Sequence, residues 1–111
     1  PRCIFNIVLY GDEPAGVLRF DYLYEKKGFE VSILTAPKFQ NLGIAGHALA
    51  QGRILLNDWD LYAYVDSSNE NSMRLFRRAG YLHTDQIGWL SAPISGKQRM
   101  SCPTLQNEVN P

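Results

Sequence analysis

The stretch APKFQNLGIAGHALA (Ala36–Ala50) decides the fold, because it separates two kinds of apolar periodicity. Before it, apolar and polar residues alternate, which is the pattern of strands with one buried face. After it, apolar and small residues recur every three or four positions, as on one side of a helix. The stretch therefore predicts the point at which a strand leaves a sheet and a helix begins.

Three segments before this stretch have the composition of strands. They are rich in β-branched and aromatic residues and span residues 3–10, 17–24 and 29–36. The sequences between them, GDEPAG and EKKG, consist largely of turn-forming residues. Strands joined by such short turns pair antiparallel, so we expect a three-stranded meander.

The segments after it predict two strand–helix repeats. An amphipathic pattern from Gly43 to about residue 58 predicts the first helix, and the nearly all-apolar residues 61–65 predict a central parallel strand. Ser67, followed by Glu70 three positions later, forms a capping-box pattern for a second helix that stops at Gly80.

In this second helix we expect Phe76 to point inward and Arg74, Arg77 and Arg78 to point outward. Residues 81–90 complete the pattern as the last strand. The order β-β-β-α-β-α-β predicts a mixed α/β fold (α+β mixed), with helices packed on a mostly antiparallel sheet.

Length and charge limit the classes of function. The 111 residues suffice for one domain, which we expect at residues 1–92, with a polar C-terminal tail at residues 93–111. The formal net charge of zero and the absence of a basic cluster argue against nucleic acid as a partner. No apolar run approaches the roughly 18 residues of a membrane span, so we expect no membrane partner. Cys3 and Cys102 lack metal-type spacing, which predicts free thiols, a cytoplasmic location and no metal site.

The small residues of the opening stretch allow two interpretations. The first turn of a helix presents unpaired N–H groups and a partial positive charge, so Gly43 would let a phosphate or pyrophosphate approach the backbone. Alternatively, Gly43, Ala45 and Gly46 are small so that the helix can lie close to the sheet. The Gly-Lys-Ser/Thr ending of a P-loop is absent, and a strand from a meander is not the start of a dinucleotide fold.

Two motifs together resemble a known family. QNLGIA (Gln40–Ala45) is similar to the Q/R-x-x-G-x-G/A pyrophosphate motif of GNAT-type N-acetyltransferases. VDSSNENSMRLFRRAGY (Val65–Tyr81) resembles the second signature of that family, which is a strand, an Asn, a helix and then Gly-aromatic. The chain is identified as a member of this family over residues 3–90, and it also resembles relatives that acetylate amino sugars.

The chain starts almost directly on what resembles the second strand of the family. The usual N-terminal strand and helices form much of the acceptor wall. We therefore expect a preceding segment, a partner subunit or a minimal domain in their place.

The resemblance implies an N-acetyltransferase that moves an acetyl group from acetyl-CoA to a primary amine by direct attack. Backbone N–H groups of the motif would hold the pyrophosphate. The pantetheine arm would pair with the end of the strand before the motif. In the family this strand usually carries a bulge, which separates it from the next parallel strand. An Asn of the second signature would contact the pantetheine. The implied acetyl-CoA-binding residues are Leu34, Thr35, Ala36, Gln40, Asn41, Leu42, Gly43, Ile44, Ala45, Asn69 and Asn71.

The catalytic groups are less clearly marked. Many relatives carry a Tyr general acid at the position of Phe76, and Phe cannot donate a proton. Glu30 is the candidate base, since it shares the alternation of Ser32 and Leu34 on the third strand; the alternative is a solvated carboxylate.

Other polar residues are weaker candidates for this chemistry. Asp21 and Tyr24 are common cross-strand residues of a meander. His47 lies on the polar side of the first helix, as a solvated surface residue would, and His83 flanks the last strand.

Three functions follow from these patterns. The first is the N-acetyltransferase, with a small-molecule or peptide amine as substrate and a homodimer as a candidate assembly. The second is a non-catalytic acyl-CoA-binding or regulatory domain, and the third is a structural or interaction domain.

Overall fold

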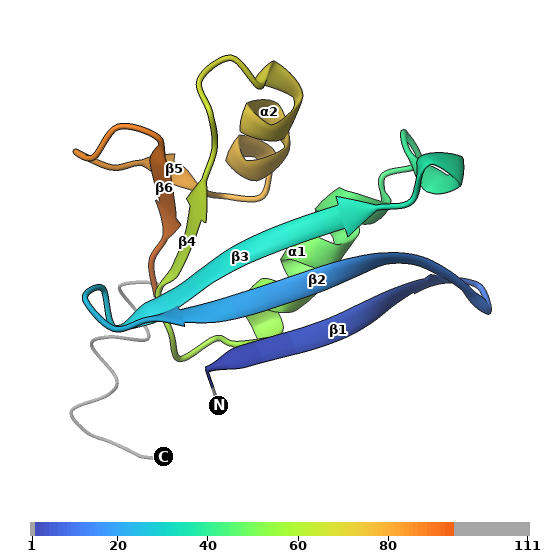
Figure 1. The fold of residues 1–111 in the computed structure, drawn as a ribbon, viewed down its shortest axis with the longest axis horizontal. Coiled ribbons are helices and arrows are strands. Elements are labelled where there is room, and N and C mark those ends of the chain that lie inside the picture. The colour runs from blue at the N-terminus through green and yellow to red at the C-terminus, as the bar shows by residue number, and fades with distance from the viewer. Residues whose placement is uncertain (1, 95–111) are drawn as a thin grey trace.

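A computed structural model describes residues 2–94, which form one sheet with two helices (Figure 1). The elements follow the order β1 (Cys3–Tyr10), β2 (Glu13–Leu23), β3 (Gly28–Thr35), a short 3-10 helix η1 (Pro37–Phe39), α1 (Ile44–Leu55), β4 (Leu61–Tyr64), α2 (Glu70–Arg78), β5 (Leu82–His83) and β6 (Trp89–Ala92). In the described part of the chain, neither helix has the length and apolar character needed to cross a membrane.

The six strands lie in the order β1-β2-β3-β4-β6-β5. The pair β3–β4 is parallel, and the other pairs of this sheet are antiparallel. This confirms the predicted mixed, mostly antiparallel sheet. α1 lies behind β2 and β3 in Figure 1 and also contacts α2, so both helices pack on one face and leave the other face of β1–β3 open.

The core lies between the sheet and this helical layer. It is formed by alternate residues of the strands, by one residue of each helix and by two residues that lie just after β4 and just before β5. These residues are Leu18, Phe20, Phe29, Val31, Leu49, Leu61, Ala63, Val65, Phe76, Tyr81, Leu90 and Ala92. Gly52 on α1 faces two of these side chains: a Cβ there would lie 3.0 Å from the Phe20 ring and 3.1 Å from Leu18. The glycine therefore lets α1 lie close to β2.

The prediction of one last strand over residues 81–90 is wrong. The segment divides into β5 and β6, and β6 lies between β4 and β5. A turn separates the two strands, in which the N–H of Gln86 donates to the Thr84 hydroxyl (3.1 Å) and Gly88 has a φ of 88°. A Cβ on Gly88 would also overlap the Tyr64 ring, so the turn needs glycine for both conformation and space.

The predicted cap of the second helix is also wrong. Asn69, not Ser67, is the N-cap of α2, and its Oδ1 accepts a hydrogen bond from the N–H of Ser72 (3.1 Å). The reason lies just before the helix, where Asp66 Oδ1 accepts two hydrogen bonds from Ser68. One comes from the backbone N–H (2.9 Å) and the other from the hydroxyl (2.8 Å). This local turn occupies the segment that the capping-box pattern assigned to the first turn of the helix.

Candidate functional site

The strands β3 and β4 diverge shortly after they meet. Their pairing is limited to Phe29 with Leu61 and Glu30 with Tyr62, after which β4 stays paired with β6 and β3 runs on to Thr35 (Figure 1). The last five residues of β3 therefore have no strand neighbour on the β4 side.

The predicted bulge in this strand is wrong. The register between β2 and β3 stays constant along their whole length, and the register shift of this meander lies between β1 and β2, at Val8/Leu9. The splay thus arises from β4 leaving β3, and β3 itself stays regular.

The backbone of β3 presents to this opening groups that bond to no neighbouring strand. The N–H of Ala36 donates to the carbonyl of Ala15 on the β2 side (2.8 Å), and the N–H of Phe29 donates to Asp60 on the opposite side (3.1 Å). Because successive residues of an antiparallel ladder alternate in direction, the N–H and C=O groups of Ile33 and Thr35 face the opening.

This alternation separates the residues that were expected to contact the pantetheine arm. Thr35 turns its backbone toward the opening, whereas the backbone groups of Leu34 and Ala36 point to β2. The Leu34 side chain lies on the open face and is 70% exposed. Ile33 has the same backbone direction as Thr35 and was missed by the sequence motif, although strand alternation was the signal that could have identified it.

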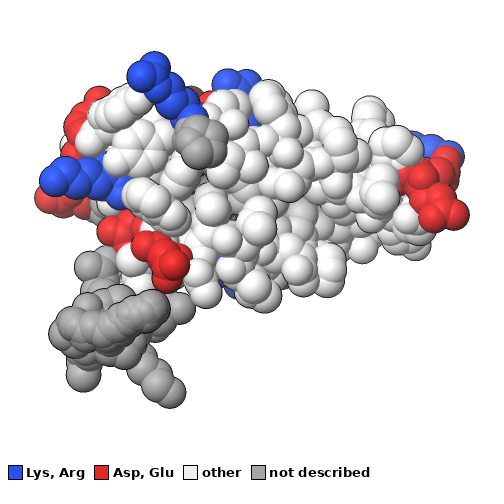
Figure 2. Space-filling model, turned by 90° about the horizontal axis from the view of Figure 1, so that it is seen from below, with Lys and Arg blue, Asp and Glu red and all other residues white. Residues whose placement is uncertain are grey.

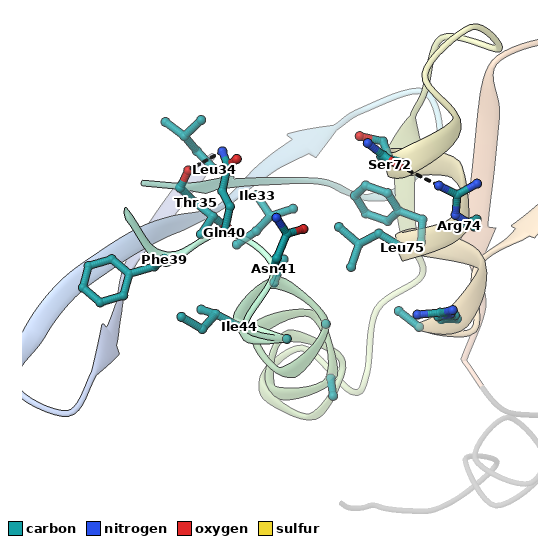
Figure 3. Close-up of a pocket in the computed structure, with 18 residues that line it drawn as sticks. Ile33, Leu34, Thr35, Phe39, Gln40, Asn41, Ile44, Ser72, Arg74 and Leu75 are labelled. Carbon is teal, nitrogen blue, oxygen red and sulfur yellow. Dashed lines mark hydrogen bonds between the residues drawn. The ribbon is translucent and has the colours of Figure 1, made fainter. Parts of the chain in front are cut away.

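The opening continues as a cleft of about 920 Å³ between β3, the start of α1 and one side of α2. Figure 3 shows Gln40 and Asn41 at the corner between β3 and α1, with Leu75 across from them. Eight of the residues expected to bind the cofactor line this cleft: Leu34, Thr35, Gln40, Asn41, Gly43, Ile44, Ala45 and Asn71. Ala36, Leu42 and Asn69 do not line it.

The N-terminus of α1 opens into the cleft without a side-chain cap. Gly43 is the N-cap, and the first helical bond runs from the N–H of His47 to the carbonyl of Gly43 (3.1 Å). The N–H groups of Ile44, Ala45 and Gly46 consequently have no partner within the helix. The first turn carries no acidic residue, so the partial positive charge of the helix end is not offset there.

Gly43 is glycine because of its backbone conformation. Its φ is 77°, a left-handed conformation that residues with a Cβ adopt at a cost, and a Cβ there would meet no atom within 4 Å. A Cβ on Gly46 would meet only Leu75, at an ordinary 3.9 Å. Close packing on the sheet, the second interpretation of the small residues, therefore belongs to Gly52 rather than to Gly43 or Gly46.

The turn before α1 is anchored at both of its ends. Phe39 and Ile44 are buried in a small cluster with Ala15, while the residues between them are mostly exposed. Gln40 spans the corner, and its Nε2 donates to the carbonyl of Thr35 at 3.4 Å. The anchors hold the exposed backbone of the motif at the mouth of the cleft.

The opposite wall of the cleft comes from α2. Asn71, Arg74 and Arg78 lie on the side that faces it, and Arg74 donates to the Asn71 side chain (2.6 Å). Both arginines are exposed, as predicted, yet they line the cleft, which the sequence did not indicate. Their spacing of four positions was a signal, because residues i and i+4 share one side of a helix. Arg77, by contrast, contacts His83 at 3.5 Å, outside the cleft.

Phe76 forms part of the cleft wall. It is 6% exposed and packs edge-on against Tyr81, with a centroid distance of 5.1 Å. The position that carries the Tyr general acid in many relatives therefore supplies an apolar surface here.

Glu30 lies at the closed end of the splay, half-buried, and outside the residues that line the cleft. Its strand neighbours are Asp21 on β2 and Tyr62 on β4. Burial raises the pKa of the Glu30 carboxyl, the charge of Asp21 raises it further, and Arg19 opposes the shift. Asp21 itself is ion-paired with Arg19 at 2.8 Å.

The other candidates lie away from this point. His47 and His83 are exposed, and Tyr24 is exposed beneath the guanidinium of Arg2. Among residues 2–94, no group of three or more His, Cys, Asp or Glu side chains is close enough to hold a metal ion.

The raised pKa of Glu30 predicts a pH-dependent stability difference. The folded state disfavours the ionised carboxylate, so the contribution of this group is full below its ordinary pKa of 4.5 and is lost as the pH rises through the raised value. Glu30→Gln should therefore raise the melting temperature by about 2 °C at pH 7 and leave it unchanged at pH 4, a small effect because the group is partly solvated. Melting curves at both pH values test this. Glu25→Gln makes the same change at an exposed position and serves as the control.

Sequence comparison identifies the family model that matches this chain. The model described as the acetyltransferase (GNAT) family matches residues 1–81. Among curated proteins, no sequence matches the chain significantly.

Solved structures share the fold. The microcin C7 self-immunity acetyltransferase MccE, in complex with acetyl-CoA and AMP, superimposes with a TM-score of 0.71 at 17% identity, over 84% of this chain and 62% of that one. The spermidine N-acetyltransferase of Vibrio cholerae, in complex with CoA and spermine, gives 0.67 at 13% identity, over 81% and 62%. The Campylobacter jejuni N-acetyltransferase PseH gives 0.68 at 17% identity, over 85% and 70%. This chain spans less than two thirds of the length of the first two.

Proposed function

Because this chain belongs to the acetyltransferase (GNAT) family, we propose that it is an acetyl-CoA-dependent N-acetyltransferase that acts on a primary amine. The observation that carries this proposal is the continuity of the cleft, which runs from the end of β3, where the strand has no partner on the β4 side, to the uncapped N-terminus of α1. Residues 1–92 are the proposed catalytic domain. Most of the proposed tail, residues 93–111, lies outside the described residues.

The residues of the cleft suit the parts of acetyl-CoA. The N–H groups of Ile44, Ala45 and Gly46 are suited to a pyrophosphate. An extended pantetheine arm could pair with the backbone of Ile33 and Thr35 in the way that an added strand does. A cleft of about 920 Å³ has the size of a ligand site, and acetyl-CoA and CoA are bound in two of the similar structures.

The residues outside the cleft take supporting roles in this proposal. Asn69 caps α2 and thereby fixes the helix that carries Asn71, so Asn71 is the proposed pantetheine contact. Ala36 fixes the end of β3 through its bond to Ala15. Leu42, which is 53% exposed, completes the turn.

The proposed reaction is a direct transfer. The amine nitrogen forms a bond to the acetyl carbon, the carbon–sulfur bond breaks, and the amine loses a proton. A backbone N–H of β3 that faces the cleft, such as that of Ile33, would stabilise the carbonyl oxygen as negative charge develops on it. Glu30, whose pKa is raised, is the proposed base and would act through water, since it lies outside the cleft lining. Water protonates the departing thiolate, because Phe76 has no proton to give.

Arg78 offers a test of the basic wall with a matched control. Arg78→Glu should weaken acetyl-CoA binding about tenfold, because it replaces a positive charge on the wall of the cleft proposed to hold this anionic ligand with a negative one. Arg77→Glu makes the same charge change one residue earlier, outside the cleft, and should weaken binding less than about twofold. Isothermal titration calorimetry measures both. Equal losses in the two variants would refute a local role for Arg78.

A second function is favoured by Phe76. A domain that binds acyl-CoA without transferring the acyl group would need the cleft but no general acid, and the described wall supplies none at this position. Such a domain would be regulatory.

Binding and turnover distinguish these functions. Acetyl-CoA is titrated calorimetrically, and release of the CoA thiol is then followed with amino sugars, small metabolite amines and a peptide with a free N-terminus. Binding with thiol release for at least one amine supports the enzyme, and the amine used identifies the acceptor class. Binding without release across the panel supports the regulatory domain, and no binding refutes both.

A further inference from the structure

Lys26, in the turn between β2 and β3, has contacts that are unusual for a lysine in a turn. Figure 2 shows basic and acidic side chains together at the end of the molecule where this turn lies, as is common for a solvated turn. Lys26 is nevertheless half-buried, whereas Lys27 beside it is exposed. Its ammonium lies 5.2 Å from the centre of the Tyr62 ring and 5.0 Å from that of the Trp89 ring. It also donates to the Gln86 side chain (2.5 Å), so two rings and an amide hold this charge.

The two rings are themselves held by close packing. Tyr62 lies against Gly28 at the start of β3, where a Cβ would come within 2.9 Å of the ring and would also overlap the carbonyl of Asp60. The Trp89 ring meets the Tyr64 ring edge-on, with 5.4 Å between their centroids. Lys26 therefore contacts aromatic surfaces whose positions are fixed by their neighbours.

The contacts of Lys26 reach β4 on both sides of the point where it leaves β3. Tyr62 belongs to the second of the two residue pairs that join β3 to β4. Trp89 on β6 pairs with Tyr64, the last residue of β4, beyond this point. One ammonium thus links the turn before β3 to the joined part of β4 and, through β6, to its diverging part. At a junction with only two residue pairs, this link helps to fix the direction in which β4 leaves β3.

The direction of β4 determines where one wall of the cleft lies. β4 continues through residues 65–69 into α2, which carries Asn71, Arg74 and Leu75 on that wall. The other wall is formed by the end of β3 and the start of α1. A rotation of β4 about its junction with β3 would therefore move α2 relative to β3 and change the width of the cleft, although Lys26 itself does not line it.

We propose that Lys26 is a positioning residue, which sets the angle between β3 and β4 and thereby the width of the cleft through its contacts with Tyr62 and Trp89. The effect of this width on acetyl-CoA rests on the proposed function, whereas the angle itself does not. The positive charge is essential, because a neutral side chain of similar length is not drawn to the ring faces and cannot donate to Gln86. Arginine keeps both properties.

Spin labels test the angle without any ligand. Both native cysteines are replaced by serine, and labels are attached at Ser32→Cys on β3 and Glu70→Cys at the start of α2, which are exposed positions on the two sides of the opening. Pulsed electron paramagnetic resonance then gives the distribution of distances between the labels. Lys26→Met should shift or broaden this distribution, whereas Lys26→Arg and the neighbouring control Lys27→Met should leave it unchanged. An unchanged distribution in Lys26→Met, or an equal change in Lys27→Met, would overturn the proposal.

Acetyl-CoA affinity separates positioning from a simple loss of stability. Calorimetric titration well below the melting temperatures should show binding about fivefold weaker in Lys26→Met and within about twofold of wild type in Lys26→Arg. A lower melting temperature with wild-type affinity in Lys26→Met would show a structural role only and would overturn the positioning role. If wild type itself binds no acetyl-CoA, the proposed function fails, and the label distances still decide whether Lys26 sets the angle.

Discussion

Gly43→Asp is expected to lower the affinity for acetyl-CoA by about 100-fold without unfolding the protein. Gly43 is the N-cap of α1, and its left-handed backbone is one that Asp and Asn tolerate better than other residues with a Cβ. The left-handed backbone costs an Asp about 1 kcal/mol, which its favourable interaction with the helix dipole partly offsets, so the melting temperature should fall by only a few degrees.

The loss of affinity has an electrostatic origin. The introduced carboxylate would lie beside the N–H groups proposed to hold the pyrophosphate. At a separation of about 4 Å and an effective dielectric constant of about 20, two like charges repel each other by roughly 4 kcal/mol. Solvent around the exposed turn screens part of this repulsion. A factor of 100 corresponds to about 2.7 kcal/mol.

Gly43→Asn separates charge from conformation. Asn has nearly the same shape as Asp and tolerates the same left-handed backbone, but it carries no charge, so its affinity loss should be far smaller. Calorimetric titration of the three proteins with acetyl-CoA measures the series, and melting curves confirm the fold. Similar affinities for Asp and Asn variants would refute an anion site at this turn.

Gly52→Val should destabilise the protein by about 2–3 kcal/mol. Even a Cβ at this position would lie only 3.0 Å from Phe20 and 3.1 Å from Leu18, and valine adds two methyl groups to it. Overpacking of this kind forces the helix away from the strands or the side chains out of their rotamers. Denaturant unfolding measures the change.

Gly46→Ala is the matched control on the same helix. Its Cβ would make one ordinary contact, at 3.9 Å to Leu75, and alanine favours a helix over glycine. This variant should therefore gain about 0.5–1 kcal/mol. Destabilisation by both replacements would show that α1 tolerates no added side chain, and would contradict the assignment of close packing to Gly52 alone.

The order of most elements follows from periodicity, because burial of one face imposes a period on each segment. β1 occupies the predicted residues, and the change of period after Gly43 marks the start of α1 at Ile44. Ala48, Leu49 and Gly52 are buried, as the three- and four-residue spacing predicted. Each of these features is determined by the residues of one helix or strand alone, so it can be predicted from the sequence.

Features that depend on competition between neighbours were not predictable in the same way. Asp66, Ser67 and Asn69 are all favourable N-cap residues, and the bonds of Asp66 to Ser68 leave the cap to Asn69. Similarly, the period of residues 81–90 does not show that the Gly88 turn must fit under the Tyr64 ring.

The walls of the cleft show a further limit of prediction from sequence periodicity. A side chain that faces a wet cleft has the same polar pattern as one that faces bulk solvent, so the periodicity of α2 placed Arg74 and Arg78 correctly outside the core but could not place them at the cleft. For this reason Asn71 is the only residue of the α2 wall that the sequence motifs indicated among those that line the cleft.

The hydrogen bond from Gln40 to the carbonyl of Thr35 has a consequence for the timing of ligand entry. That carbonyl points toward the cleft and is the group with which an extended ligand would pair. The Gln40 side-chain amide thus holds the position that an amide of the proposed pantetheine ligand would take. At 3.4 Å this hydrogen bond is long and weak. Replacing it with a bond from a ligand amide would therefore cost little free energy, and the Thr35 carbonyl would be without a protein or ligand partner only briefly.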